Sequence, residues 1–208
     1  MQHDHINWQQ YIDLCERLVA RVAESGWEFD SLLCLARGGM RPGDFFSRIY
    51  SKPLAIMTTS SYREAAGTVQ GDLDIAKYIT GVSDLKGKLL LVDDLCDSGK
   101  TIQKVVEHLK KNYPAITEIR VAVIWVKACS VFHPDYHVVE YKDAPWIHQP
   151  CEVDDDLGRL STWKSAAKNT ATSSDPSALT TRILSESDFG QDFFIGRRGV
   201  FSQNACVR

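Results

Sequence analysis

The stretch that most constrains the fold lies at residues 89–101, which read LLLVDDLCDSGKT. Leu89–Val92 is a continuous apolar run, which is typical of a parallel strand covered on both faces. Two aspartates follow at the carboxyl end of this strand, the edge at which open α/β sheets bind ligands. Small and polar residues from Asp97 to Thr101 then mark a turn, and Ile102–Leu109 has helical spacing. The pattern predicts a strand, an acidic pair, a loop and a helix.

Three interpretations of this stretch compete. It fits an acidic turn that caps a helix, because Asp and Ser are common N-caps, but the two carboxylates before the turn are then unexplained. It also ends like a Walker A loop, with Gly99-Lys100-Thr101. That motif needs a glycine five positions before Gly99, where this chain has Asp94, and a carboxylate there would repel the phosphates. The third is a phosphate site formed by free backbone N–H groups at a helix N-terminus.

The third interpretation is supported by a resemblance. The stretch resembles the signature of the type I phosphoribosyltransferases, a hydrophobic strand, two acidic residues and a loop ending in Thr-Gly-x-Thr, with Ser98 here replacing the first Thr. The resemblance implies an α/β fold, a mainly parallel sheet flanked by helices, with a flexible lid loop and a small hood. It implies Asp97, Asp93 and Asp94 as catalytic residues. The implied ligands of phosphoribosyl pyrophosphate (PRPP) in this stretch are Asp93, Asp94, Asp97, Ser98, Gly99, Lys100 and Thr101.

Two earlier segments match the same family. Arg37-Gly38-Gly39 ends the apolar run Ser31–Ala36, and LARGGMRPG resembles the pyrophosphate-binding loop of the bacterial xanthine-guanine phosphoribosyltransferases. Taken alone, it also fits a tight strand-to-helix turn with a surface arginine. Ser61 and Tyr62 match the Ser-Tyr pair that opens the lid of these enzymes, although such pairs are common. Residues 63–86 then lose apolar periodicity, and connections of this length inside a domain are usually functional or mobile.

Two later segments point to a purine base. Lys127 ends the β-branched run Ile119–Val126, and its side chain has only hydrogen-bond donors, so beside a base it favours a carbonyl oxygen over an amino group. Residues 143–150 (DAPWIHQP) resemble the purine-binding segment of the same enzymes, which implies that Trp146 and Ile147 pack at the base. A solvated lysine and a Trp-Pro loop packed on the core are the structural alternatives. The family continues with Trp-Asp where this chain has Cys151-Glu152, so the preferred base stays open.

The remaining pattern predicts the elements between these motifs. Apolar residues from Trp8 to Val22 step by three and four, which predicts a helix, and Pro42 suits the first turn of another. Further strands are expected at 54–57 and 136–141, so strands and helices alternate as in a parallel sheet covered on both faces. From Ser161 to Ser187, 12 of 27 residues are Ser or Thr. We therefore expect a phosphoribosyltransferase domain over 1–157 and a weakly ordered tail over 158–208.

Composition and the N-terminal residues limit the partners and the cellular compartment expected for this chain. Among 208 residues, 44% are hydrophobic and 25% charged, and the net charge of -3 gives no support for binding nucleic acid or a membrane surface. No stretch reaches the ~20 apolar residues that span a bilayer. The N-terminal MQHDHINWQQ lacks the features of a secretory signal, so we expect a cytoplasmic protein. The six cysteines show no CxxC pair and are expected to be reduced thiols. Cys15 and Cys34 are expected in the core, and Cys96 is expected to fill a position in the signature loop without a catalytic role.

Together these resemblances imply a Mg²⁺-dependent purine phosphoribosyltransferase of purine salvage. It would transfer 5-phosphoribosyl from PRPP to hypoxanthine, guanine or xanthine, giving a nucleoside monophosphate and pyrophosphate. Asp93 and Asp94 would meet the metal directly or through water and PRPP. The expected partners are PRPP and a purine, without nucleic acid or membrane, and a homo-oligomer is left open. The alternative is a PRPP-binding regulatory protein of the same fold without transferase activity.

Overall fold

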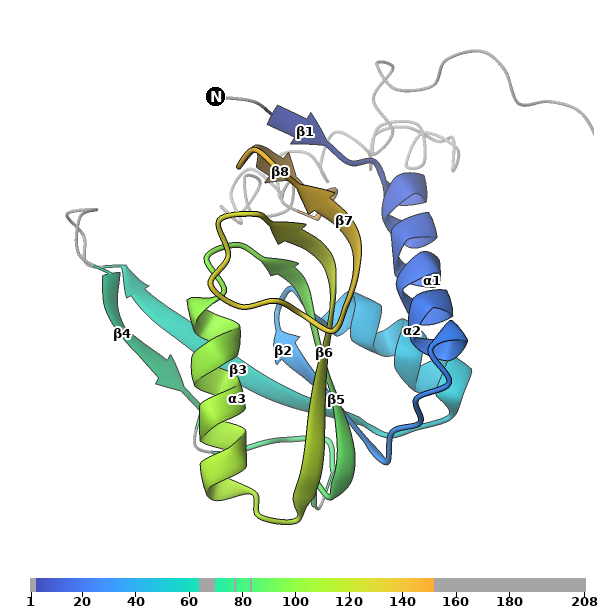
Figure 1. The fold of residues 1–208 in the computed structure, drawn as a ribbon, viewed down its shortest axis with the longest axis vertical. Coiled ribbons are helices and arrows are strands. Elements are labelled where there is room, and N and C mark those ends of the chain that lie inside the picture. Colours follow the sequence, from blue (N-terminus) through green and yellow to red (C-terminus); the bar gives the residue numbers. More distant parts are fainter. Residues whose placement is uncertain (1–2, 64–69, 77, 83, 152–208) are drawn as a thin grey trace, which may run out of the picture. The chain divides into compact units, whose positions relative to one another are not determined.

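The structure, a computed structural model, describes residues 3–63, 70–76, 78–82 and 84–151 (Figure 1). The predicted tail at 158–208 and part of the predicted lid, residues 64–69, lie outside these described residues. The helices are α1 (Trp8–Glu24), α2 (Met40–Tyr50) and α3 (Lys100–Asn112). The strands are β1 (His3–His5), β2 (Ser31–Ala36), β3 (Leu54–Arg63), β4 (Gln70–Ile75), β5 (Gly87–Cys96), β6 (Ile116–Lys127), β7 (Tyr136–Tyr141) and β8 (Trp146–His148).

Six strands form the main sheet, in the order β4-β3-β2-β5-β6-β7. Every neighbouring pair is parallel except β3 and β4, which confirms the predicted mainly parallel sheet. From β2 the chain continues to β3 on one side and later returns to β5 on the other. The strand order therefore reverses between β2 and β5, and ligands bind at such switch points, outside the carboxyl ends of the strands. The Arg-Gly-Gly segment and the acidic pair both lie there.

Helices cover both faces of this sheet, with α1 and α2 on one side and α3 on the other (Figure 1). The central strands are apolar on both faces because successive side chains point in opposite directions. Leu90 and Val92 pack with α1 and α2, whereas Leu89 and Leu91 pack with α3, and all four are fully buried. The continuous apolar run that predicted a doubly covered strand is confirmed. None of the helices in the described residues is long and apolar enough to cross a membrane.

The structure differs from the sequence-based expectations in three strands of the sheet, β3, β4 and β5. The strand expected at 54–57 extends to Arg63, and part of the segment expected without periodicity forms β4, antiparallel to β3 with Ser61 opposite Leu73. An antiparallel strand at a sheet edge needs no two-sided apolar run, so its sequence carries a weak signal. The signature strand also continues beyond Val92, through the acidic pair, to Cys96.

A second, two-stranded sheet corresponds to the predicted small hood. In it β1 runs parallel to β8, and His3 pairs with Trp146 and His5 with His148. These strands are three residues long, too short to produce a recognisable period. The hood joins the beginning of the chain to the segment expected to hold the base.

Candidate active site

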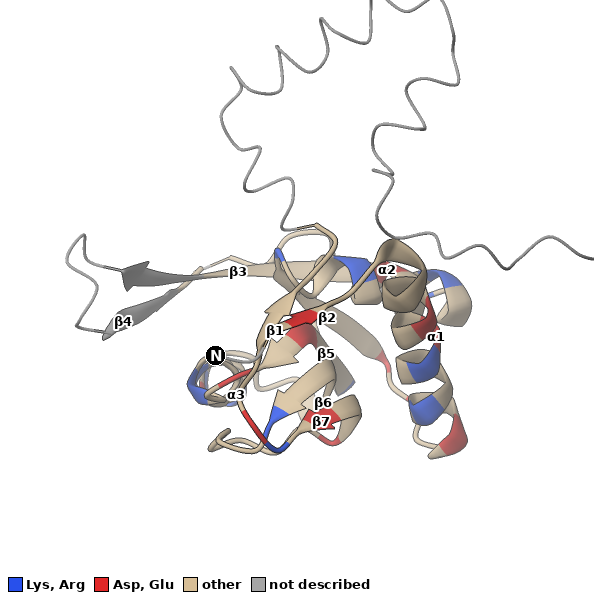
Figure 2. Ribbon diagram, turned by 90° about the horizontal axis from the view of Figure 1, so that it is seen from above, with Lys and Arg blue, Asp and Glu red and all other residues tan. Residues whose placement is uncertain are grey.

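The two carboxylates of the acidic pair face different surroundings. Asp93 lines a cavity of about 120 Å³ in front of α3. Asp94 is held by two donors: the amide of Leu95 donates to Oδ1 at 2.7 Å, and Nε2 of Gln149 donates to Oδ2 at 2.5 Å. Adjacent residues on a strand point to opposite faces, so one carboxylate reaches the cavity and the other reaches the hood side. Figure 2 shows acidic ribbon in red beside the labels β2 and β5.

Asp93 lies in an environment that disfavours its charge. Burial raises the pKa of the Asp93 carboxyl well above its ordinary value, and the neighbouring charge of Asp94 raises it further. The backbone N–H groups of Asp94 and Gly39 oppose this pKa rise, because they donate to the ionised form. Asp93 is therefore a carboxyl group that positive charge from a ligand would help to ionise.

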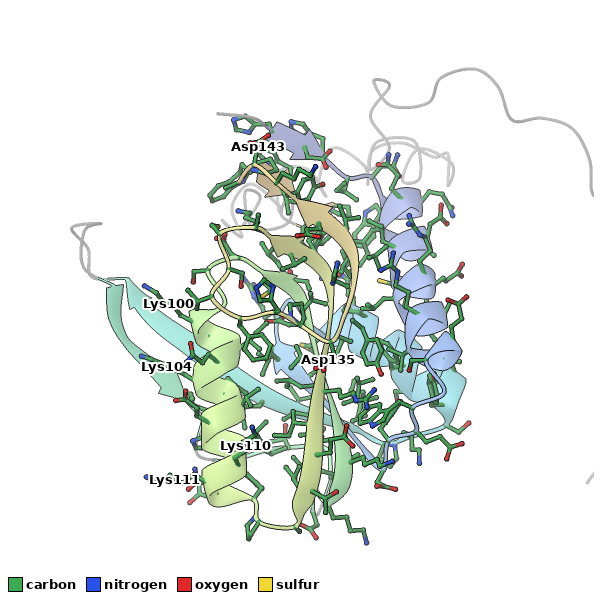
Figure 3. The ribbon with its side chains drawn as sticks, viewed as in Figure 1. Lys100, Lys104, Lys110, Lys111, Asp135 and Asp143 are labelled. Carbon is green, nitrogen blue, oxygen red and sulfur yellow. The ribbon has the colours of Figure 1, made fainter. Side chains whose placement is uncertain are left out.

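The predicted phosphate loop surrounds the same cavity. Its walls include Asp97, Ser98, Gly99 and Thr101. The helix α3 begins immediately afterwards at Lys100, which Figure 3 labels at its first turn. The first backbone N–H groups of a helix have no partner within it and attract anions. Loop, helix start and cavity therefore form a suitable phosphate cradle.

The turn after β6 braces this loop from outside. The amide of Val131 donates to the carbonyl oxygen of Ser98 at 3.0 Å. Gly99 has φ +76°, and a side chain there would overlap the Ser130 hydroxyl. The same hydroxyl lies 3.1 Å from the thiol of Cys96, which is buried. The brace fixes the backbone of the loop that forms the candidate phosphate site.

The Arg-Gly-Gly segment makes close contacts with the acidic pair. A methyl group on Gly38 would overlap the Asp94 carboxylate, and one on Gly39 would overlap the carbonyl oxygen of Val92. The peptide bond between Ala36 and Arg37 is cis, and the Arg37 side chain is exposed. The two glycines therefore allow the end of β2 to lie directly against the end of β5.

Lys127 and Asp97, which the sequence assigned to two different motifs, form an ion pair. The Lys127 ammonium lies 3.1 Å from Oδ1 of Asp97. The Lys127 side chain, at the end of β6, is 10% exposed, whereas the Asp97 side chain is 61% exposed. A donor-only group and an acceptor are thus held side by side at the edge of the phosphate cavity.

The predicted base segment is only partly exposed. Trp146 is 47% exposed, but Ile147 is 5% exposed and packs in the core on the α1 side. The Ile147 side chain therefore follows the structural alternative, which leaves its backbone for any contact with a base. Asp143, the first residue of this segment, lies in an exposed loop (Figure 3).

Sequence reasoning gave no role to Gln149 or Ser130. Gln149 shares the inward face of its segment with buried Ile147, and a polar side chain at such a position was the available signal. The Ser130 contact joins distant parts of the chain and left no local signal. For Ser61 and Tyr62 the structure describes the backbone, in β3, and not the side chains.

The described residues hold no group of three or more His, Cys, Asp or Glu side chains that could bind a metal. A metal cage made by these residues alone is therefore not supported. Mg²⁺ commonly uses only one or two carboxylates and keeps waters and substrate phosphates as its other ligands. Asp93 and Asp94 fit that mode of binding.

Known proteins resemble this chain in sequence and in fold. Residues 5–156 match the model of the phosphoribosyl transferase domain family. The xanthine-guanine phosphoribosyltransferase of Idiomarina loihiensis is 25% identical over 149 residues, covering 71% of this chain and 86% of the relative.

Two solved structures share the fold. The purine phosphoribosyltransferase from Pyrococcus horikoshii is 30% identical, with a TM-score of 0.59, and the match covers 71% of this chain and 92% of that one. The Helicobacter pylori xanthine-guanine-hypoxanthine phosphoribosyltransferase is 27% identical, with a TM-score of 0.61, and the match covers 77% and 99%.

Proposed function

The chain belongs to the phosphoribosyltransferase family, and from this premise we propose that it transfers 5-phosphoribosyl from PRPP to a 6-oxopurine. The products would be a nucleoside monophosphate and pyrophosphate, as in purine salvage. The observation that carries the proposal is the Lys127–Asp97 pair beside the phosphate cavity. It offers a donor and an acceptor at adjacent positions, which matches the carbonyl oxygen and the N7–H of a 6-oxopurine.

The phosphate cavity would hold the 5′-phosphate of PRPP. Backbone N–H groups at the start of α3 and the hydroxyls of Ser98 and Thr101 are suitable donors. Asp93, in the same cavity, would accept from a ribose hydroxyl. Asp94 would do the same while Gln149 stays bound, because each carboxylate oxygen has a second lone pair beside the donor that it already accepts. The ribose would thus lie at the switch point between β2 and β5, with its C1 directed toward Lys127 and Asp97.

The transfer forms a bond between the purine N9 and the ribose C1 and breaks the bond from C1 to pyrophosphate. The leaving oxygen takes the bonding electron pair, and the purine N7 proton passes to the Asp97 carboxylate. Lys127 would donate a hydrogen bond to the 6-oxo group and keep the base oriented for the reaction. Trp146 would cover it, which helps to exclude water from the cation-like ribose centre.

Pyrophosphate departs with negative charge that the site must stabilise. The Arg37 side chain and the backbone of Gly38 and Gly39 would receive it. A magnesium ion carried by PRPP would supply further positive charge there, with Asp93 and Asp94 as ligands directly or through water. The raised pKa of Asp93 fits this role, because nearby positive charge restores the ionised carboxylate.

One assay tests the activity directly. The protein is incubated with PRPP, Mg²⁺ and each of hypoxanthine, guanine, xanthine and adenine, and the nucleotide formed is measured. We expect turnover with at least one 6-oxopurine and little with adenine. No turnover with any base would contradict the proposed enzyme. PRPP binding without turnover, together with a gel shift of nucleic acid, would instead support the regulatory alternative.

The role of Asp97 can be tested by Asp97→Asn. We expect turnover to fall by about 10²–10⁴, the usual contribution of general acid–base catalysis, while PRPP affinity changes little. Steady-state kinetics and PRPP titration on both proteins would separate the two effects. Equal turnover of variant and wild type would remove Asp97 from proton transfer.

A further inference from the structure

The amide of Gln149 is held at both ends. Its Nε2 donates to Asp94 Oδ2 at 2.5 Å, and its Oε1 accepts from the Cys151 thiol at 3.8 Å. The residue is 9% exposed, one of the few buried polar side chains among the described residues. A buried amide with both ends engaged keeps one orientation, because rotating it would place donor against donor.

Three segments that are distant in sequence meet at the Asp94 carboxylate. Gln149 follows β8 and reaches Asp94 from the hood, while Gly38 lies so close that a methyl group there would overlap the carboxylate. Asp94 itself belongs to β5, and its second oxygen accepts from the amide of Leu95. The base segment, the pyrophosphate loop and the signature strand therefore share one contact point.

We propose that Gln149 is a positioning residue that ties the base segment to Asp94 and so sets the Asp94 carboxylate for PRPP. The inference rests on the proposed function for its kinetic part, while the contact itself is independent of activity. A hydrogen bond from a neutral donor to a half-buried carboxylate is strong, and its loss frees the carboxylate to rotate. An enzyme without Gln149 would therefore bind PRPP less well, although Gln149 lies in the base segment.

A donor–acceptor exchange tests the contact. Gln149→Glu places two carboxylates together and should lower the unfolding midpoint, whereas adding Asp94→Asn restores one amide and one carboxylate with the direction of donation reversed. We expect the double variant to be more stable than Gln149→Glu alone, although it carries one substitution more. Thermal melts of the wild type, both single variants and the double variant complete the cycle. Additive effects of the two substitutions would overturn the contact.

The chain offers a matched control for this exchange. On α1, Nε2 of Gln9 donates to Oδ1 of Asp13 at 2.9 Å, and both residues are exposed. The same substitutions, Gln9→Glu and Asp13→Asn, repeat the chemistry at the surface, where solvent screens the charges. We expect a coupling several times smaller there. Equal coupling at the two pairs would show that the location of Gln149 and Asp94 does not strengthen their hydrogen bond, and would count against the proposal.

Kinetics of Gln149→Leu test the positioning role. We expect the KM for PRPP to rise about tenfold, as the loss of a hydrogen bond to a charged group predicts, with the order of preference among purines unchanged. A merely structural effect would reduce the active fraction, and so kcat, at unchanged KM; this result would overturn the role. If the wild type has no transferase activity, the proposed function fails, while the stability cycle still decides the contact.

Discussion

Asp93 combines two demands on one side chain. Its position in the cavity suits the binding of ribose or metal, but burial and the adjacent Asp94 make its charge unfavourable in the free protein. Removing the charge should therefore favour folding while harming function. Ligand sites commonly show this conflict between stability and activity.

We expect Asp93→Asn to be more stable than wild type at neutral pH and much less active. The raised pKa means that, above the ordinary carboxyl pKa of about 3.9, the folded chain keeps a proton that the unfolded chain has lost. The contribution of Asp93 to the free energy of unfolding therefore falls as pH rises through that window. Melting curves over a pH series would show this slope in the wild type and its loss in the variant. A parallel slope in both would contradict the assignment.

Lys127→Gln should change which base is accepted. Glutamine offers an acceptor as well as a donor, so it removes the preference for a carbonyl oxygen. We expect kcat/KM for 6-oxopurines to fall about 10- to 100-fold and adenine to gain relative to them. Assays with each base, beside the exposed-site control Lys142→Gln, would measure the change. An unaltered preference would place the specificity elsewhere.

Among the elements, the turn after β6 controls the loop before α3. Gly99→Ala places a side chain at φ +76° and against Ser130, so we expect it to cost about 1–3 kcal/mol of stability and to raise the KM for PRPP. Gly26→Ala is a close control, since Gly26 has φ +67° at the end of α1 with nothing within 4 Å of the added group. It should lower the melting temperature and leave the KM for PRPP unchanged. A raised KM in both variants would show that global strain, and not the brace, is responsible.

How far the sequence predicts each element depends on how local its signal is. The run Leu89–Val92 predicts a strand covered by helices on both faces, because burial on both faces requires a continuous apolar run. The edge strand β4 and the short β1 have no such run, so periodicity could not reveal them. Lys127 and Asp97 were each expected near the ligand edge, but their ion pair was not predicted, and Gln149 reaches Asp94 only through the long-range approach of the hood.

At the scale of the whole described unit, β1 holds β8 in place in the hood. The Tyr141 hydroxyl donates to Asp4 on β1, next to the pairing of β1 with β8. We expect Tyr141→Phe to lower the stability of the hood by about 1 kcal/mol, because one hydrogen bond is lost. The KM for the base should rise about fivefold, with the KM for PRPP unchanged. Tyr50→Phe is the control, because the buried Tyr50 hydroxyl has no hydrogen-bond partner among the described residues. A base KM unaffected by Tyr141→Phe would separate the hood from base binding.

The pairing of β1 with β8 also has a consequence for synthesis on the ribosome. His3 and His148 are in contact across 145 positions of the chain, so β1 leaves the exit tunnel long before β8 and can pair only when β8 has followed. The loop before α3 and its brace at Ser130 are complete earlier. A nascent chain should therefore form the loop before α3 before it forms the hood. A protein fused ahead of β1 should then hinder the later pairing of β1 with β8.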